Sequence, residues 1–97
     1  MSEQFLKDPN AVIDYAVDWT ANYLLVGEQV TTSNWEIVPS GAMSDLVIDN
    51  VPLLLSGVAS VFISGGITGK VYRLINRIST DQGRTDDRTI TIRVEEK

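Results

Sequence analysis

Three pairs of carboxylates are the residues whose types and spacing could do acid–base chemistry: Asp14 with Asp18, Asp45 with Asp49, and Asp86 with Asp87. A glycosidase needs two carboxyl groups facing each other across a cleft, one of them in apolar surroundings that raise its pKa. On a strand, residues 14 and 18 would lie about 13 Å apart along one face. The arginines beside residues 86 and 87 favour ionised carboxylates there. The carboxylates therefore do not predict a hydrolase.

Metal ligands and nucleophiles are scarce. The chain has no cysteine and no histidine, so thiolate and imidazole ligands, and the triads built on them, are excluded. A Ser–Lys pair would need a serine beside one of the three lysines, and no spacing indicates it. Calcium binds oxygen ligands, but the Asp86–Asp87 segment lacks the spacing of an EF-hand loop. We therefore expect no enzyme activity, no catalytic residue, no cofactor and no metal site.

The segment Ser64-Gly65-Gly66-Ile67-Thr68-Gly69-Lys70 resembles a phosphate-binding loop at first sight. A P-loop needs a glycine where Ser64 stands and a serine or threonine where Val71 stands. Strands are expected on both sides, so no helix N-terminus would be available for a phosphate. We interpret the segment as a glycine-rich turn.

Composition sets further limits. The 97 residues are enough for one domain, and 43% hydrophobic with 22% charged residues is typical of a folded globule. The net charge of −5 disfavours a nucleic-acid partner, because an acidic surface repels phosphate. The N-terminus lacks a signal-peptide profile, and the apolar stretch from Val51 to Ile63 is interrupted and too short for a membrane span. We expect a protein made in the cytoplasm, with no membrane partner.

Alternation of apolar and polar residues indicates strands along most of the chain. Asp14 and Asp18 are predicted on the solvent face of the first of these, and Asp81-Gln82-Gly83-Arg84 is predicted as a hairpin turn. The expected strands are Ile13–Trp19, Tyr23–Val26, Gln29–Val38, Leu46–Ile48, Val58–Ile63, Val71–Ser79 and Thr89–Val94.

This pattern predicts an all-β fold, an immunoglobulin-like or fibronectin-III-like sandwich of about six to seven antiparallel strands. Residues 1–10 are expected to form an N-terminal arm and residues 11–97 the domain. Trp19 and Trp35 fall on inward faces, which favours core packing over a sugar-stacking platform. Tyr72 begins a strand that leads into a hairpin, where a tyrosine can cap a Greek-key corner.

Several short motifs occur in the order found in small proteins of tailed phages and prophages. They are Lys7-Asp8-Pro9, Asp14-Tyr15 with Asp18-Trp19, Ser33 to Gly41 with Trp35 and Pro39, Ser64-Gly65-Gly66 with Gly69 and Tyr72, and Gly83 to Arg88. Through them nearly the whole chain resembles the phage fiber–tail adaptor family. That resemblance implies an immunoglobulin-like module that joins tail, neck or fiber components in the virion, assembled in the bacterial host. It implies no catalytic residues.

The chain departs from this family between Ala42 and Val61, where relatives are rich in threonine and aspartate. Here three leucines follow one another, and they cannot all face one core because strand side chains alternate. Either the strand is covered on both faces or part of it is exposed, and an exposed apolar patch usually marks an interface. We predict that Leu54→Glu changes the oligomeric state. The candidate interface residues are Leu53, Leu54, Leu55, Arg84, Asp86, Asp87 and Arg88.

The leading interpretation is a virion assembly protein that binds other phage structural proteins and is used as a homo-oligomer, because phage tails and necks are cyclic. The alternative is an immunoglobulin-like adhesion or carbohydrate-binding module of a cell surface. The missing signal peptide and the initiating methionine favour the first.

Overall fold

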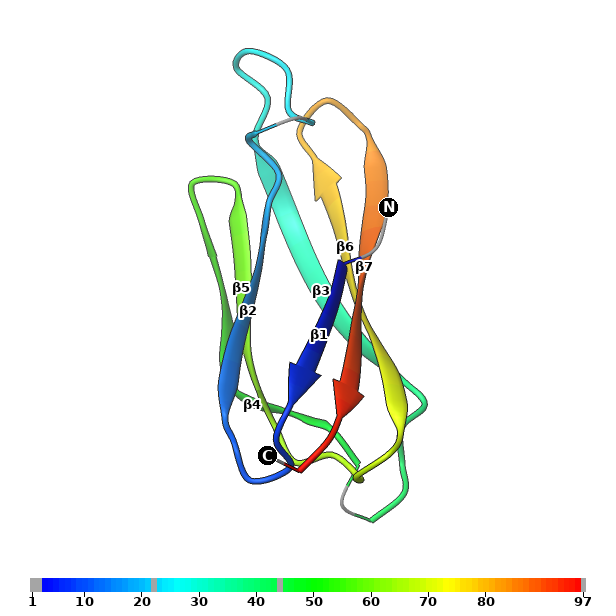
Figure 1. The fold of residues 1–97 in the computed structure, drawn as a ribbon. Helices are drawn as coiled ribbons and strands as arrows, with labels where there is room; N and C mark the ends of the chain where they lie inside the picture. Colours follow the sequence, from blue (N-terminus) through cyan, green and yellow to red (C-terminus); the bar gives the residue numbers. More distant parts are fainter. Residues whose placement is uncertain (1–2, 22, 44, 97) are drawn as a thin grey trace.

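Seven strands in two sheets are present in the computed structural model, which describes residues 3–21, 23–43 and 45–96 (Figure 1). One sheet has the strand order β1-β7-β6-β3 and the other β2-β5-β4. This arrangement confirms the predicted all-β sandwich. The strands are β1 (Glu3–Lys7), β2 (Ile13–Asp18), β3 (Val30–Val38), β4 (Val47–Leu55), β5 (Val58–Ser64), β6 (Val71–Thr80) and β7 (Thr85–Val94).

The core lies between the sheets, where alternate side chains of the strands meet. In β2, Tyr15 and Val17 are buried, while Asp14 and Asp18 are exposed, as the alternation predicts. Trp19 is fully buried, and its indole N–H donates to Asn76 Oδ1 over 2.8 Å. The partly buried Trp35 packs against the same core. Other core residues are Ile37, Leu46, Ala59, Val61, Ile63, Tyr72, Leu74, Ile78, Ile90, Ile92 and Val94.

The glycine-rich segment between β5 and β6 is a loop, as expected, and Tyr72 follows it. The Ile67 N–H donates to the Tyr72 hydroxyl over 3.1 Å, so the ring closes this corner of the sandwich. Gly66 has a φ of +108°, and a Cβ there would lie 2.7 Å from Val94 Cγ2. Glycine is therefore required at this position by both conformation and space.

The strand predicted for Tyr23–Val26 is wrong, since the structure has a loop there. The Leu24 N–H donates to Trp19 O, and the Glu28 N–H donates to Leu25 O, which closes a turn in which Gly27 has a φ of +80°. Local apolar character favoured a strand, but these hydrogen bonds fold the segment back on itself.

The predicted end of the fourth strand at Asp49-Asn50 is also wrong, because β4 continues to Leu55. It is an edge strand that pairs only with β5, and its register shifts between Asp49 and Leu53. Pro52 lies within this irregular stretch. An edge strand with a bulge tolerates a proline, which has no N–H to donate to a neighbouring strand.

Half of the segment expected as an arm forms β1, which runs parallel to β7 at the edge of the four-stranded sheet, so this strand pair is not antiparallel as predicted. The Phe5 ring contacts the Tyr15 ring edge-on at 5.5 Å between centroids. Lys7 is fully buried, and its ammonium donates to Asp8 O and to Gly65 O over 2.9 and 2.7 Å. Burial lowers the pKa of Lys7. The domain boundary at residue 10 stays a prediction.

Candidate protein-binding surfaces

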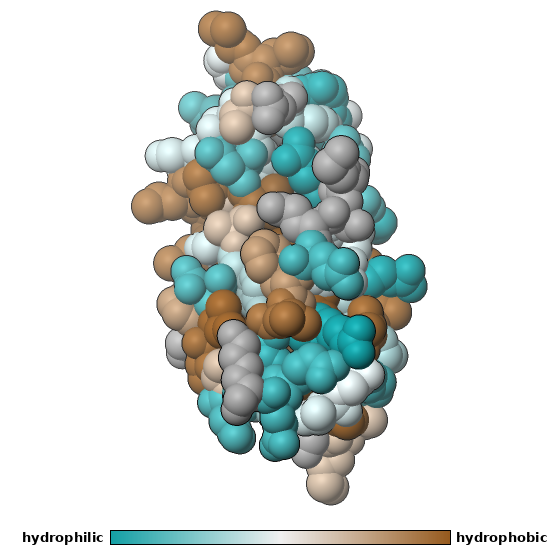
Figure 2. Space-filling view, viewed as in Figure 1, coloured by the Kyte–Doolittle hydropathy of each residue, from teal (hydrophilic) through white to brown (hydrophobic). Residues whose placement is uncertain are grey.

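The outer face of the β2-β5-β4 sheet carries exposed apolar side chains. Register pairs Leu55 with Val58 and Leu53 with Ser60, while Phe62 lies between Asp14 and Asp49. Figure 2 shows apolar atoms gathered on the left-hand side of the molecule, where β4 and β5 lie. We call the outward residues of this sheet the apolar face; its exposed apolar members include Val47, Leu53, Leu55 and Phe62.

Of the three predicted interface leucines, the structure turns two outward and one inward. Leu53 is 61% exposed and Leu55 is 75% exposed. Leu54 is partly buried and packs against the core. Part of the strand is therefore exposed, which was one of the two arrangements expected. The substitution Leu54→Glu would place a charge toward the core, so Leu53 and Leu55 are the positions that report on binding.

The charged side chains of the sheet that carries the apolar face are all acidic. None of the residues of β2, β4 and β5 is lysine or arginine, whereas Asp14, Asp18 and Asp49 belong to these strands. Hydrogen bonds from Thr20 lower the pKa of Asp18, so this carboxylate is ionised at neutral pH. A partner surface with an apolar centre and cationic margins would match this face in both properties.

The predicted tip around Gly83–Arg88 is a surface of another kind, because its charges are engaged within the chain. Arg77 forms an exposed ion pair of 2.9 Å with Asp87. The Arg88 guanidinium lies 4.8 Å from the centroid of the Trp19 ring. Asp86 is exposed, and its carboxylate accepts from the Asp87 N–H. Arg84 is turned toward the body of the protein.

Glu28 is the buried partner of Arg84. Its carboxylate accepts hydrogen bonds from Arg84 Nε over 2.9 Å, from Thr80 Oγ1 over 2.6 Å and from the Leu25 N–H over 2.9 Å. The Arg84 guanidinium also donates to Tyr23 O and lies over the Tyr23 ring. These hydrogen bonds, that from Arg84 foremost, lower the pKa of Glu28 to about 2. The network fastens the β2–β3 loop to the β6–β7 hairpin.

Asp45, Lys70 and Tyr72 form a second network at the other end. The Tyr72 hydroxyl donates to Asp45 Oδ1 over 2.5 Å, and Lys70 Nζ donates to the same oxygen over 2.9 Å. The pKa of Asp45 is lowered, mainly by the Tyr72 hydrogen bond. The pKa of Lys70 is raised by its bond to Asp45, and that of Tyr72 is raised mainly by burial. A general base at neutral pH would need a lowered pKa on Lys70 or Tyr72, so these directions do not favour acid–base catalysis by the trio.

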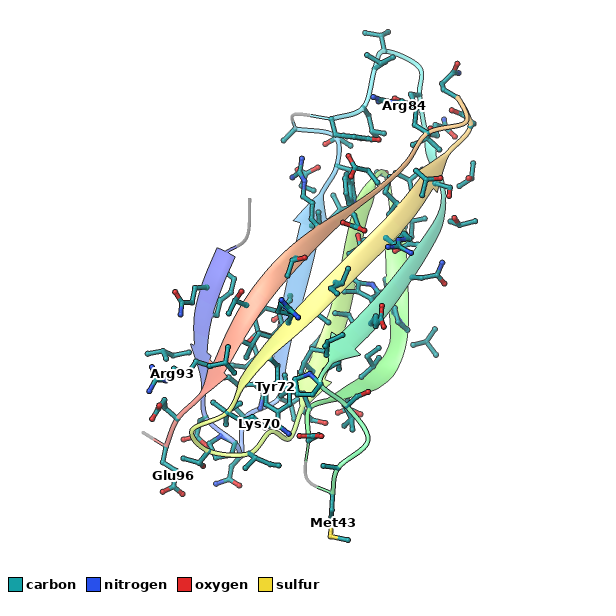
Figure 3. All side chains as sticks on the ribbon, turned by 90° about the vertical axis from the view of Figure 1, so that its right-hand side faces the viewer. Met43, Lys70, Tyr72, Arg84, Arg93 and Glu96 are labelled. Carbon is teal, nitrogen blue, oxygen red and sulfur yellow. The ribbon has the colours of Figure 1, made fainter. Side chains whose placement is uncertain are left out.

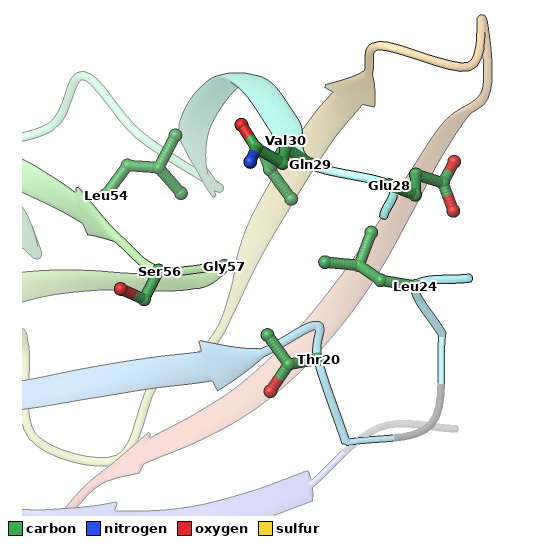
Figure 4. Close-up of a pocket in the computed structure, with 8 residues that line it drawn as sticks. All are labelled: Thr20, Leu24, Glu28, Gln29, Val30, Leu54, Ser56 and Gly57. Carbon is green, nitrogen blue, oxygen red and sulfur yellow. The ribbon is translucent and has the colours of Figure 1, made fainter. Parts of the chain in front are cut away.

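A hollow of about 530 Å³ opens between the β2–β3 loop and the β4–β5 hairpin (Figure 4). Leu24, Val30 and Leu54 contribute apolar walls, and Figure 4 shows the Glu28 carboxylate turned away from Leu54 and Ser56. Its one acidic group is thus committed to Arg84. Among the described residues no group of three or more acidic side chains could hold a metal ion.

Sequence reasoning missed Glu28 and paired Asp45 with Asp49 instead of Lys70 and Tyr72, because the partners of both carboxylates lie far along the chain. One available signal concerned the apolar face: no lysine or arginine occurs between Lys7 and Lys70. A cation-free stretch that supplies β2, β4 and β5 must give their sheet an acidic and apolar outer side.

Comparisons with known proteins agree with the architecture. The solution structure of the PKD domain from KIAA 1837 protein is similar with a TM-score of 0.55 at 12% identity, covering 99% of this chain and 81% of that chain. This likeness shows the fold alone. No curated protein matches the sequence. No helix among the described residues could cross a membrane. The model of the family described as podophage GP4 fiber-tail adaptor protein gp77 matches residues 7–93, and the chain belongs to that family.

Proposed function

We propose that this protein is a non-catalytic structural adaptor of a tailed-phage virion, which joins a fiber component to a tail component by protein–protein contacts. The observation that supports this best is the apolar face, where Leu53 and Leu55 are exposed on a sheet whose strands also carry three aspartates. Exposed apolar side chains that are grouped on one face favour a protein partner. Membership of the adaptor family supplies the kind of partner.

Several copies per particle are part of the proposal, since tails are cyclic and each protomer can repeat the same contact. The adhesion or carbohydrate-binding alternative has less support. Trp19 is fully buried and Trp35 is partly buried against the core, so neither tryptophan is exposed as a sugar-stacking platform requires.

The test is co-sedimentation of the purified chain with tail particles that lack it, and separately with purified fiber protein. The double variant Leu53→Glu/Leu55→Glu should lose binding to at least one of them, because it places two carboxylates where apolar contact is needed. The matched control is Val71→Glu, since Val71 is 48% exposed on the other sheet. Unchanged binding of the double variant to both would contradict the role of this face.

A further inference from the structure

Two aliphatic side chains project from the end of the sandwich formed by the β2–β3 loop and the β6–β7 turn. Leu25 is 62% exposed and Val26 is fully exposed. They lie in the turn that the Glu28 N–H closes on Leu25 O over 2.9 Å. We call Leu25–Glu28 the apical turn. It belongs to the cyan loop at the top of Figure 1, and Figure 2 shows apolar atoms at the same end.

The apical turn is held firmly by groups that lie far away in the sequence. The Glu28 carboxylate binds the Leu25 N–H on one side and Thr80 and Arg84 on the other. Beside it, the Gln29 N–H donates to Asp81 Oδ1, and the Asp81 N–H donates to Gln29 O. A preorganised turn loses little conformational entropy on binding, which favours affinity.

Turn formation alone does not account for Leu25 and Val26. Exposed turns favour glycine, asparagine, aspartate, serine and proline, and a β-branched valine gains nothing there. Single exposed apolar residues are common, but two adjacent ones on a turn held by a partly buried ion pair favour a binding contact.

We propose that the apical turn inserts into an apolar socket on a protein partner, and so provides a contact of the adaptor in addition to its apolar face. A projecting turn can bury Val26 on all sides only in a concave surface. Nothing lies within 4 Å of a Cβ built on Gly27, so space around the turn is open for such a socket. On the adjoining hairpin Arg77 is paired with Asp87, Arg84 is paired with Glu28, and Arg88 lies over the Trp19 ring, whereas Asp81 and Asp86 are exposed. These exposed carboxylates favour a cationic rim and disfavour an anionic membrane.

This inference rests on the proposed function, and its test uses the same tail particles and fiber protein. Val26→Asp should weaken binding to one of them at least about tenfold, because an apolar contact is lost and a charge is introduced. Met43→Asp is the matched control: Met43 is 91% exposed and lies at the opposite end from Arg84 (Figure 3). Equal weakening by both variants, or none by Val26→Asp, would overturn the proposal. A wild-type chain that binds neither component would instead refute the proposed function.

A second readout reports on the socket itself. The chain has no cysteine, so Val26→Cys offers one site for an environment-sensitive fluorophore. Its emission should shift to the blue when the component is added, and the same dye on Met43→Cys should not respond. An unshifted spectrum at position 26 in a complex that has formed would rule out an apolar socket. Blue-shifted emission with phosphatidylglycerol vesicles would assign the turn to a membrane and overturn the proposal as well.

Discussion

At the scale of single residues, Glu28 links stability to pH. Its pKa is about 2 in the folded protein against an ordinary 4.5. A carboxyl group with a lowered folded pKa stabilises the fold above its unfolded pKa, and this stabilisation is lost as the pH falls from about 4.5 to 2. Glu28→Gln should therefore lower the melting temperature at pH 7 and flatten its fall across that window. Thermal unfolding measured from pH 7 to pH 2 checks this. The exposed Glu36→Gln is the control, and an equal acid dependence in both variants would refute the role of the Arg84 pair.

Gly66 and Gly69 provide a paired test of space against conformation. Both have positive φ, +108° and +86°, but only at position 66 would a Cβ meet atoms closer than 3 Å, from Val94 and Leu46. Gly69→Ala should cost about 1–2 kcal/mol through backbone conformation alone. Gly66→Ala should cost about 1–3 kcal/mol more, since the core must shift. Urea unfolding measures both free energies; equal losses would mean that the Val94 contact relaxes freely.

At the scale of elements, β1 tests whether residues 1–10 are dispensable. Deleting them would uncover the edge of β7, leave the Tyr15 ring without Phe5, and remove the buried Lys7. We expect a lower melting temperature and association through the freed edge, because unpaired strand edges bind other strands. Calorimetry and light scattering of residues 11–97 would show this. A monomer with wild-type stability would instead support the boundary predicted at residue 10.

On adjacent residues of β4, an effect on stability can be distinguished from an effect on binding. Leu54→Ala should destabilise the fold by about 1–2 kcal/mol, less than for a fully buried leucine because Leu54 is only partly buried. Leu53→Ala should change stability by less than about 0.5 kcal/mol, as is usual for exposed positions. Chemical denaturation compares the two. A larger loss at Leu53 would show that its side chain contributes to the core after all.

These elements also show how far sequence alone reaches. Alternation in β2, β6 and β7 predicts the sandwich because each strand has one buried face, a property local to the strand. The edge position of β4 depends on how strands pair across the chain, so the sequence did not show that Leu46–Ile48 and the three leucines are joined across Pro52 in one strand. Three consecutive leucines predicted a strand that is either covered on both faces or partly exposed, and only the register with β5 shows which two face outward. The loop at Tyr23–Val26 depends on Arg84, 56 residues from its partner Glu28.

At the scale of the whole molecule, the positive charges are concentrated in the C-terminal part of the sequence. All but one of the eight lysines and arginines lie from Lys70 onward, while β2, β4 and β5 contain none. The four-stranded sheet therefore carries cations such as Arg73 and Arg93 together with carboxylates such as Glu36, whereas the charged side chains of β2, β4 and β5 are all carboxylates. A domain that is charged differently on its two sides approaches a partner in a preferred orientation, because the field acts before contact is made.

Because the charged side chains are distributed unevenly, we expect binding at the apolar face to depend on the salt concentration. Raising NaCl from about 50 to 500 mM shortens the screening length to a few ångströms, so association should slow by on the order of tenfold if the partner's margin is cationic. Asp14→Asn/Asp49→Asn should bind more slowly at low salt and lose most of that dependence, since these carboxylates flank Phe62. Glu36→Gln, on the other sheet, should keep it. Stopped-flow association rates decide the matter: a dependence that survives in the double variant would place the steering charges elsewhere on the molecule.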